Sequence, residues 1–349
     1  MSLTARRLHS FLGAGLAVIC MEAAVRTVYQ LPVAFEPGFG NIIRPGATVI
    51  WGREGHGVSR WTHFGIRRES LPRDFASGRS ILVLGNSNAE ALQVSDEAVF
   101  TTLLERRLAE LKAPVLNMGR QGTPLAEHVA FAGRNQETFN PRWTILLLGT
   151  GDLGSRTWIP GLSHFERDDG GRLIAKGRAL APRSPWRARL SPLVNGCMLL
   201  VYGVVRKDEF LLASASQAAL FNGATNTPVA RDRDNPEGDV ESYPIEEELD
   251  LLSEAYRGRI TFLLLPRLSF KEPRRRGAAE ERIEAHCAAR GLSCVNPRPL
   301  YPGLVDQGLS PFGFPNESFN EGHMNSDGHR IVAEVLALEL RKILSRELR

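Results

Sequence analysis

ILVLGNSN, residues 81–88, is the stretch that decides the fold. It begins with a short, continuous apolar run and ends that run with a glycine, which is typical of a strand buried in a parallel sheet. Similar runs recur at 114–117 (PVLN), 144–149 (TILLLG) and 260–266 (ITFLLLP), and a shorter one lies at 293–295. This spacing predicts an α/β fold with a doubly wound, three-layer parallel sheet flanked by helices.

The segments between these strands predict helices over about 100–111, 124–138, 245–256, 277–290 and 327–347. Residues 155–245 break the alternation, so we expect an insertion there. Its sequence predicts a hairpin turn at 168–171, a helical stretch at 190–220 and a mobile loop at 222–243. The expected organisation is a targeting segment over 1–30, an irregular lead-in over 31–78, and the α/β domain over 79–349.

Composition excludes several classes of protein. The 349 residues are 43% hydrophobic and 23% charged, which is ordinary for a globular protein. The formal charge is only +4, and no stripe of interleaved aromatic and basic residues indicates nucleic-acid binding. There is no CxxC pair, and His323 and His329 do not share a helical face, so no metal site is predicted. No cofactor is implied.

The amino end has the pattern of a membrane-targeting segment. Arg6 and Arg7 precede an apolar run from Phe11 to Met21, which suits a signal peptide or an uncleaved signal anchor. The residues after it form no good cleavage site, which favours an anchor with a single transmembrane helix. The rest of the chain would then lie outside the cytoplasm, in the periplasm. The alternative is a buried or amphipathic first helix of a soluble protein, in which Glu22 and Arg26 pair.

Cys287 and Cys294 flank the end of a predicted helix. Outside the cytoplasm they could form a local disulfide. The alternative, two small buried side chains, fits the sequence equally well.

Polar or small residues follow several of the predicted strands, where ligand and catalytic groups gather in sheets of this kind. Ser87 lies on the tight turn after 81–84, and glycines follow the next two strands at Gly122 and Gly151. His323 stands in a glycine-containing loop before the last helix, with Glu321 two residues earlier. A serine with a histidine base and a carboxylate is the pattern of nucleophilic catalysis. Taken alone, Ser87 could equally be a helix cap.

Together these blocks resemble the SGNH (GDSL-type) hydrolase family. ILVLGNSNAEALQVSDEAVFTTLL (81–104) resembles the first block, VLNMGRQG (115–122) the second, LLGTGDL (147–153) the third and 320–333 the last. FGIR (64–67) resembles a lead-in found in membrane-anchored bacterial members. The resemblance implies Ser87 as nucleophile, His323 as base, Glu321 as the residue that orients the base, and Gly122 as an oxyanion donor. At the position of the second oxyanion donor the chain has Gly151.

The chain departs from the family at three of these positions. The change at Glu321, which matches the usual aspartate before the histidine, keeps a carboxylate on a longer side chain. Asn86 stands where the family usually has aspartate, and Gly151 stands where it has a donating asparagine, whose loss typically costs about 10²–10³ in turnover. An amide of Asn86, Asn88 or Asn325 could replace that donor.

Two functions follow. The first is an extracytoplasmic serine esterase or acyltransferase acting on O-acyl esters of an envelope polysaccharide or lipid. The second is a catalytically impaired scaffold subunit that contacts a protein partner through 155–245.

Overall fold

The computed structural model describes residues 3–28, 33–36, 40–149, 162–176, 243–317 and 319–346. Helix α1 (Leu3–Val28) belongs to a different unit from the α/β body and is described by itself. Among the described residues, no helix combines the length and the apolar character that crossing a membrane requires.

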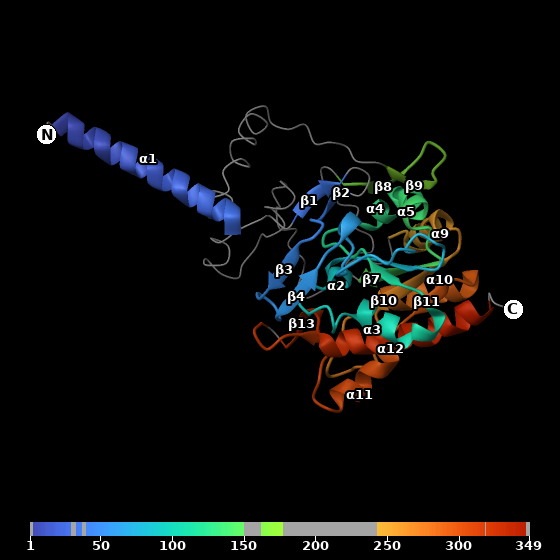
Figure 1. Cartoon of the computed structure of the whole chain (residues 1–349). Coiled ribbons are helices and arrows are strands. Elements are labelled where there is room, and N and C mark those ends of the chain that lie inside the picture. Colours follow the sequence, from blue (N-terminus) through green and yellow to red (C-terminus); the bar gives the residue numbers. More distant parts are fainter. Residues whose placement is uncertain are drawn as a thin grey trace. The chain divides into compact units, whose positions relative to one another are not determined.

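The α/β body is built on a five-stranded parallel sheet (Figure 1). Its strands lie in the order β11-β10-β7-β5-β6, and each neighbouring pair is parallel. Their bounds are β5 Ile81–Leu84, β6 Val115–Asn117, β7 Trp143–Gly149, β10 Ile260–Leu265 and β11 Ser293–Val295. All five predicted strands are therefore confirmed, and so is the α/β fold class.

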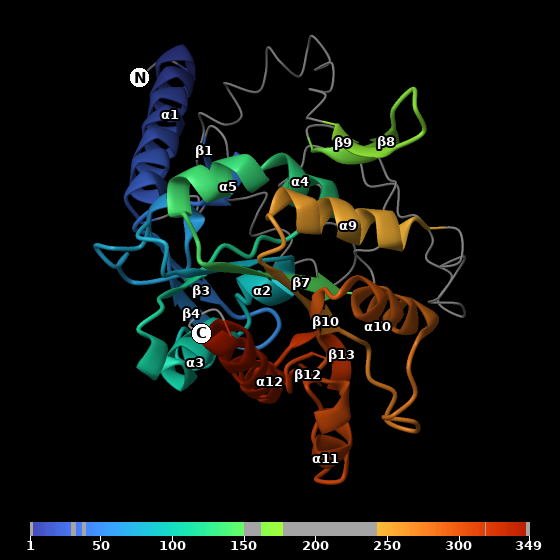
Figure 2. The same ribbon diagram turned by 90° about the vertical axis from the view of Figure 1, so that its right-hand side faces the viewer.

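Helices cover both faces of this sheet (Figure 2). Alternate side chains of a strand point to opposite faces, so Ile81 and Val83 of β5 join one core while Leu82 and Leu84 join the other. The first core lies under α3 (Phe100–Arg107) and α12 (Ser326–Arg346), with α11 (Tyr301–Val305) beside them. The second lies under α4 (Leu125–Ala130), α5 (Ala132–Phe139), α9 (Ile245–Ala255) and α10 (Ala278–Arg290).

The lead-in is more regular than its sequence indicates. In place of an irregular segment it has two antiparallel hairpins, β1–β2 (Val33–Glu36 with Gly40–Ile43) and β3–β4 (Thr48–Trp51 with Gly57–Arg60). Glycine and proline in the segment mark the turns between short strands as well as irregular backbone. The second hairpin is tied to the body by a small core in which Trp61 packs against Ile43 and Leu92.

Two further parts of the chain test the predicted connections. The expected turn at 168–171 joins β8 (His164–Arg167) to β9 (Leu173–Lys176) and is confirmed. The other two predictions for the insertion, at 190–220 and 222–243, lie outside the described residues. His323 stands on a short strand, β13 (Phe319–Met324), paired with β12 (Phe312–Gly313), where we expected a loop.

The cysteine pair is reduced in the structure. Cys287 is buried, Cys294 is partly buried, and both are free thiols. Burial and the neighbouring Cys287 thiol raise the pKa of Cys294 above its ordinary value, with the hydrogen bond to Cys287 as the largest cause. The two side chains are therefore neighbours with no bond between their sulfur atoms.

Candidate functional site

Ser87 is the first residue of a single-turn helix, α2 (Ser87–Glu90), directly beyond the carboxyl end of β5. The turn between them requires Gly85, whose φ is 147° and where a Cβ would lie 2.9 Å from the Leu147 Cβ. Asn86 caps the helix, because its side-chain oxygen accepts the Asn88 N–H at 2.9 Å. An amide therefore does the capping that a carboxylate could do, and Asn86 does not disturb the turn.

Ser87 and His323 meet although 236 positions separate them. The Ser87 Oγ lies 2.9 Å from the His323 Nε2, which is hydrogen-bonding distance. Asn88 joins the same two elements, because its side-chain oxygen accepts the Met324 N–H at 2.8 Å. The His323 side chain is 29% exposed, so solvent reaches the pair.

The carboxylate that contacts His323 belongs to Glu54, where we expected Glu321. One Glu54 oxygen pairs with the His323 Nδ1, and the other accepts the His323 backbone N–H at 2.5 Å. Glu321 is exposed. Gly322, with φ of 75°, stands between Glu321 and His323 and gives Glu54 room, because a Cβ there would lie 2.2 Å from the Glu54 Oε1.

Glu54 lies at the tip of the β3–β4 hairpin, which Asn316 fixes in place. The Asn316 side-chain oxygen accepts the Gly55 N–H at 2.8 Å. Its amide nitrogen donates to the carbonyl oxygens of Gly52, Arg53 and Gly55 at 3.1–3.4 Å. Asn316 precedes β13, so the same short segment carries the base and holds the hairpin that carries the carboxylate.

The Glu54–His323 contact is electrostatically favourable. Burial by itself would raise the pKa of Glu54, but the hydrogen bonds and the charge of His323 outweigh it and hold the pKa below its ordinary value. Glu54 is therefore ionised at neutral pH. An ionised carboxylate on Nδ1 fixes the imidazole tautomer that leaves Nε2 free to accept a proton from Ser87.

The second strand-end loop, 119–122, lies against α2. Gly119 has no room for a side chain, because a Cβ would lie 2.3 Å from the backbone of Ala89 and Glu90. Gly122 has a φ of 66°. Within the described residues, neither the Ser87 N–H nor the Gly122 N–H donates to a protein acceptor. Gly151, the other predicted oxyanion residue, lies outside the described residues.

Two other polar residues, just before α12 and in its first turn, are structural. Asn325 caps α12 by accepting the N–H groups of Asp327 and Gly328, and its amide nitrogen donates to two carbonyl oxygens, so it is not an oxyanion donor. His329 is fully buried, stacks on Phe100 at 5.7 Å and accepts the Phe100 N–H. Burial lowers the pKa of His329 to about 3, so it stays neutral.

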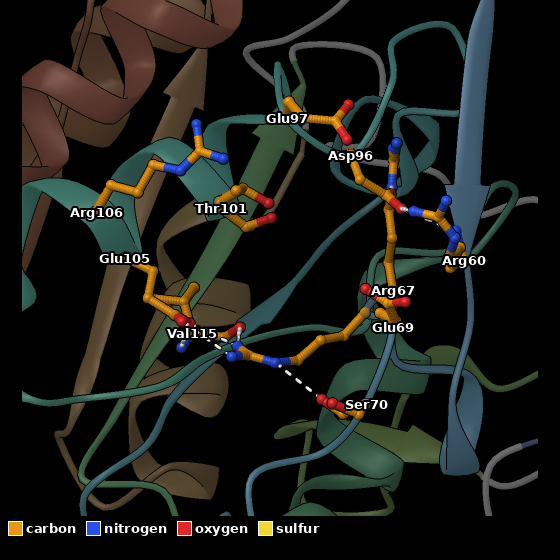
Figure 3. A pocket seen from close by; sticks show the side chains of 12 residues that line it. Arg60, Arg67, Glu69, Ser70, Asp96, Glu97, Thr101, Glu105, Arg106 and Val115 are labelled. Atoms are coloured by element: carbon orange, nitrogen blue, oxygen red, sulfur yellow. Dashed lines mark hydrogen bonds and ion pairs between the residues drawn. The ribbon is translucent and has the colours of Figure 1, made fainter.

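A cavity of about 330 Å³ lies apart from this site (Figure 3). Four arginines and four carboxylates line it, and several of them pair with one another: Arg67 with Asp96, and Arg68 with Glu105. Arg67 also donates to the carbonyl oxygens of Glu90, Ala91 and Val94, at the end of α2 and just after it. The cavity therefore lies where Arg67 attaches the lead-in to α2 and the loop that follows it.

Within the described ranges, no group of three or more His, Cys, Asp or Glu side chains is arranged to hold a metal ion. The arrangement that the structure does contain is suited to nucleophilic chemistry: a hydroxyl, an imidazole and a carboxylate in a chain.

Sequence reasoning predicted Ser87 and His323, which the structure brings together, but it did not predict the contacts of Glu54 and Asn316. Glu54 is separated from His323 by 269 positions and follows no strand of the main sheet. The one signal in the sequence is WGREGHG (51–57), an acid between glycines in a short hairpin, and that pattern is common in turns that have no function.

The fold and the site define a three-layer α/β protein with a Ser–His–Glu arrangement beyond the carboxyl end of a parallel strand. It is similar in structure, at low sequence identity, to a lipolytic protein of the G-D-S-L family from Veillonella parvula. The two are 12% identical, the match covers 74% of this chain and 96% of that chain, and the TM-score is 0.39.

Two more structures are similar to a comparable extent. TesA is 13% identical, with 75% of this chain and 98% of that chain covered and a TM-score of 0.37. A carbohydrate acetylesterase family member from Sinorhizobium meliloti is 10% identical, with coverages of 76% and 99% and a TM-score of 0.33. No family model and no curated protein matches the chain. The fold assignment rests on the strand order and layers of the chain itself.

Proposed function

We propose that this protein is a serine ester hydrolase that uses Ser87 as nucleophile, His323 as general base and Glu54 as the residue that orients the base. The observation that carries the proposal is the continuous chain of contacts from the Ser87 Oγ through both ring nitrogens of His323 to the Glu54 carboxylate. Three side chains from three separate elements make these contacts, and each has the chemistry that its place requires.

The reaction proceeds in two acyl transfers. The Ser87 Oγ attacks the ester carbonyl carbon while His323 takes the hydroxyl proton on Nε2. The tetrahedral intermediate collapses, the bond to the leaving alcohol breaks, and His323 gives its proton to that alcohol. Water then attacks the acyl-Ser87 ester with His323 again as base, which releases the acid and restores the hydroxyl. A sugar hydroxyl in place of water would make the second step an acyl transfer.

The N–H groups of Ser87 and Gly122 are the donors for the oxyanion. Both lack a protein acceptor in the described part of the chain, and the Ser87 N–H lies at the start of α2, where unpaired donors gather. Each such donor contributes about 3 kcal/mol to stabilising the transition state in comparable sites. Gly151 is the third candidate, as its place after β7 predicts.

For the substrate we propose an O-acyl ester of an envelope polysaccharide or lipid, located outside the cytoplasm. The support is the amino-terminal pattern of two arginines followed by the apolar run 11–21. A fusion of residues 1–40 to a reporter that is active only outside the cytoplasm tests this location. Activity is expected with the native sequence, and loss of activity when Leu16 and Ile19 are changed to Asp. A reporter that stays inactive in both would contradict it.

A fluorophosphonate probe tests the catalytic proposal, because it labels only an activated serine. The native protein should be labelled, and labelling should be lost in Ser87→Ala and fall at least 100-fold in rate in His323→Ala. Glu137→Gln, an exposed acid on α5, is the control and should label like the native protein. Absence of labelling in a folded native protein would contradict catalysis and leave the scaffold interpretation.

A further inference from the structure

The reaction proposed above leaves one buried carboxylate of the site without a role. Glu90 is the last residue of α2, one helical turn after Ser87, and its side chain is 5% exposed. Acids are rarely buried so completely unless a partner stabilises them. The partner of Glu90 is a backbone group, since its Oε2 accepts the Gln121 N–H at 3.3 Å.

This contact fixes the residue next to the proposed oxyanion donor. Three successive N–H groups of the loop have acceptors: Gly119 donates to the Asn117 side chain at 2.9 Å, Arg120 to the Gly85 carbonyl at 2.9 Å, and Gln121 to Glu90. The fourth N–H, that of Gly122, has none among the described residues. The Glu90 carboxylate therefore accepts from Gln121, the residue that directly precedes Gly122.

The close packing of Gly119 on the Glu90 backbone limits how the loop can move relative to α2. Gly119 packs directly on Ala89 and Glu90, where a Cβ would come within 2.3 Å of the backbone. The loop therefore cannot move closer to α2, and the Glu90 side chain restrains it from moving away. Ser87 and Glu90 belong to the same helical turn, so the nucleophile and the restraint share one rigid element.

We propose that Glu90 is a positioning residue that holds the 119–122 loop against α2 and so places the Gly122 N–H beside Ser87. This inference rests on the proposed function, because it assigns the Gly122 N–H to the oxyanion. Glu90 itself touches neither the nucleophile nor the reacting atoms.

Glu90 also makes the restraint sensitive to pH. Three cations or potential cations face it: Arg67 from the lead-in, Arg120 from the loop and His323 from β13. Burial raises the pKa of Glu90 to about 7, although the Gln121 N–H and these charges oppose the rise. The ionised carboxylate is the stronger acceptor, so the loop is held more firmly above pH 7 than below it.

Two substitutions separate the role of the acceptor from that of the charge. Glu90→Gln keeps an acceptor for the Gln121 N–H and removes the charge, whereas Glu90→Ala removes both. Hydrogen exchange of the 118–124 peptide measures the restraint without any need for turnover. Exchange should be at least tenfold faster in Glu90→Ala, only slightly faster in Glu90→Gln, and unchanged in the control Glu137→Gln.

Hydrolysis of p-nitrophenyl acetate measures the consequence. Glu90→Ala should lower kcat at least tenfold with little change in KM. The ratio of native kcat to Glu90→Gln kcat should rise a few-fold as the pH rises through about 7, because the ionised carboxylate holds the loop more firmly than a neutral acceptor does. A ratio that stays constant across this pH range overturns the pH sensitivity.

Equal exchange in native protein and Glu90→Ala overturns the positioning role. If the native protein has no Ser87-dependent turnover, the proposed function fails, and the exchange result still decides whether Glu90 holds the loop.

Discussion

The segment that carries the nucleophile and the hairpin that carries the acid are built in opposite ways. Residues 81–90 run along β5, an interior strand of the main sheet, into α2, and every side chain in β5 is buried between two cores. Residues 48–60 form a small hairpin outside the main sheet. Its first strand, β3, alternates between exposed and partly buried residues, and its second, β4, is buried at Gly57 and Ser59. Yet Glu54 at its tip contacts His323 as closely as Ser87 does.

The difference shows that the two halves of one site need not have the same structural support. Ser87 is placed by its own strand, its own glycine and its own cap. Glu54 is placed by residues more than 260 positions away, Asn316 and Gly322. Substitutions at Glu54, Asn316 and Gly322 should therefore reduce activity while leaving most of the stability intact, because few buried contacts are lost.

The largest loss of activity is expected from changing Glu54, the carboxylate at the tip of the hairpin. Glu54→Gln should lower kcat/KM roughly 10³-fold, because an amide no longer stabilises the imidazolium or enforces its tautomer. Glu321→Gln should change it less than about threefold. Steady-state kinetics with an activated ester measures both. The reverse ranking would return the orienting role to Glu321 and remove the hairpin from the site.

A smaller loss is expected at the glycine that leaves room for the acid. Gly322→Ala should lower kcat/KM roughly 10²-fold, because its Cβ would lie 2.2 Å from the Glu54 Oε1. Gly308→Ala is a matched control with a similar positive φ of 71° and no atom within 4 Å of its Cβ. Both variants should lose about 1 kcal/mol of stability from backbone strain. Equal activity in the two would show that strain, and not contact with Glu54, matters at Gly322.

The residue that fixes the hairpin should matter less, because the carboxylate keeps its own contacts. Asn316→Ala removes four hydrogen bonds to the 52–55 backbone and should lower kcat about tenfold. Gln307→Ala, which removes an exposed amide bond to the Gly303 carbonyl, should leave kcat unchanged. Unfolding midpoints of both should stay within a few degrees of the native value. A large loss of stability in Asn316→Ala alone would mean that the hairpin supports the fold and not only the site.

The pH dependence of stability tests the two carboxylates without turnover, because they act on it with opposite signs. Glu54 has a lowered pKa in the folded protein, so its contribution is present above its unfolded pKa near 4.5 and is lost as the pH falls. Glu90 has a raised pKa, so folding loses stability between about 4.5 and 7 as the pH rises, by about 3 kcal/mol at most.

Denaturant unfolding from pH 4 to 8 compares the two variants with the native protein. Relative to native, Glu54→Gln should become less stable as the pH rises, and Glu90→Gln more stable. Parallel curves for the two variants would contradict the opposite electrostatic environments of the two carboxylates.

Most of the fold could be predicted from the sequence because each strand of the main sheet has a recognisable local pattern. An apolar run ended by glycine at 81–85 or 144–149 predicts a buried strand whatever surrounds it, and the helices between the strands have their own periodicity. The lead-in was harder to predict, since turns within a hairpin and irregular backbone use the same glycines and prolines. The strand at 319–324 was missed because two residues with positive φ, Asn320 and Gly322, interrupt its pattern.

For the candidate site, the sequence by itself predicted Ser87, His323 and the glycine loop, since each directly follows or precedes an element with a clear pattern. Only the tertiary structure decided which carboxylate contacts His323 and that Asn86 caps α2. Glu321 is close along the chain, but chain distance does not set the direction of a side chain. Glu54 reaches His323 because Asn316 and Gly322 bring together backbone segments that no local pattern relates.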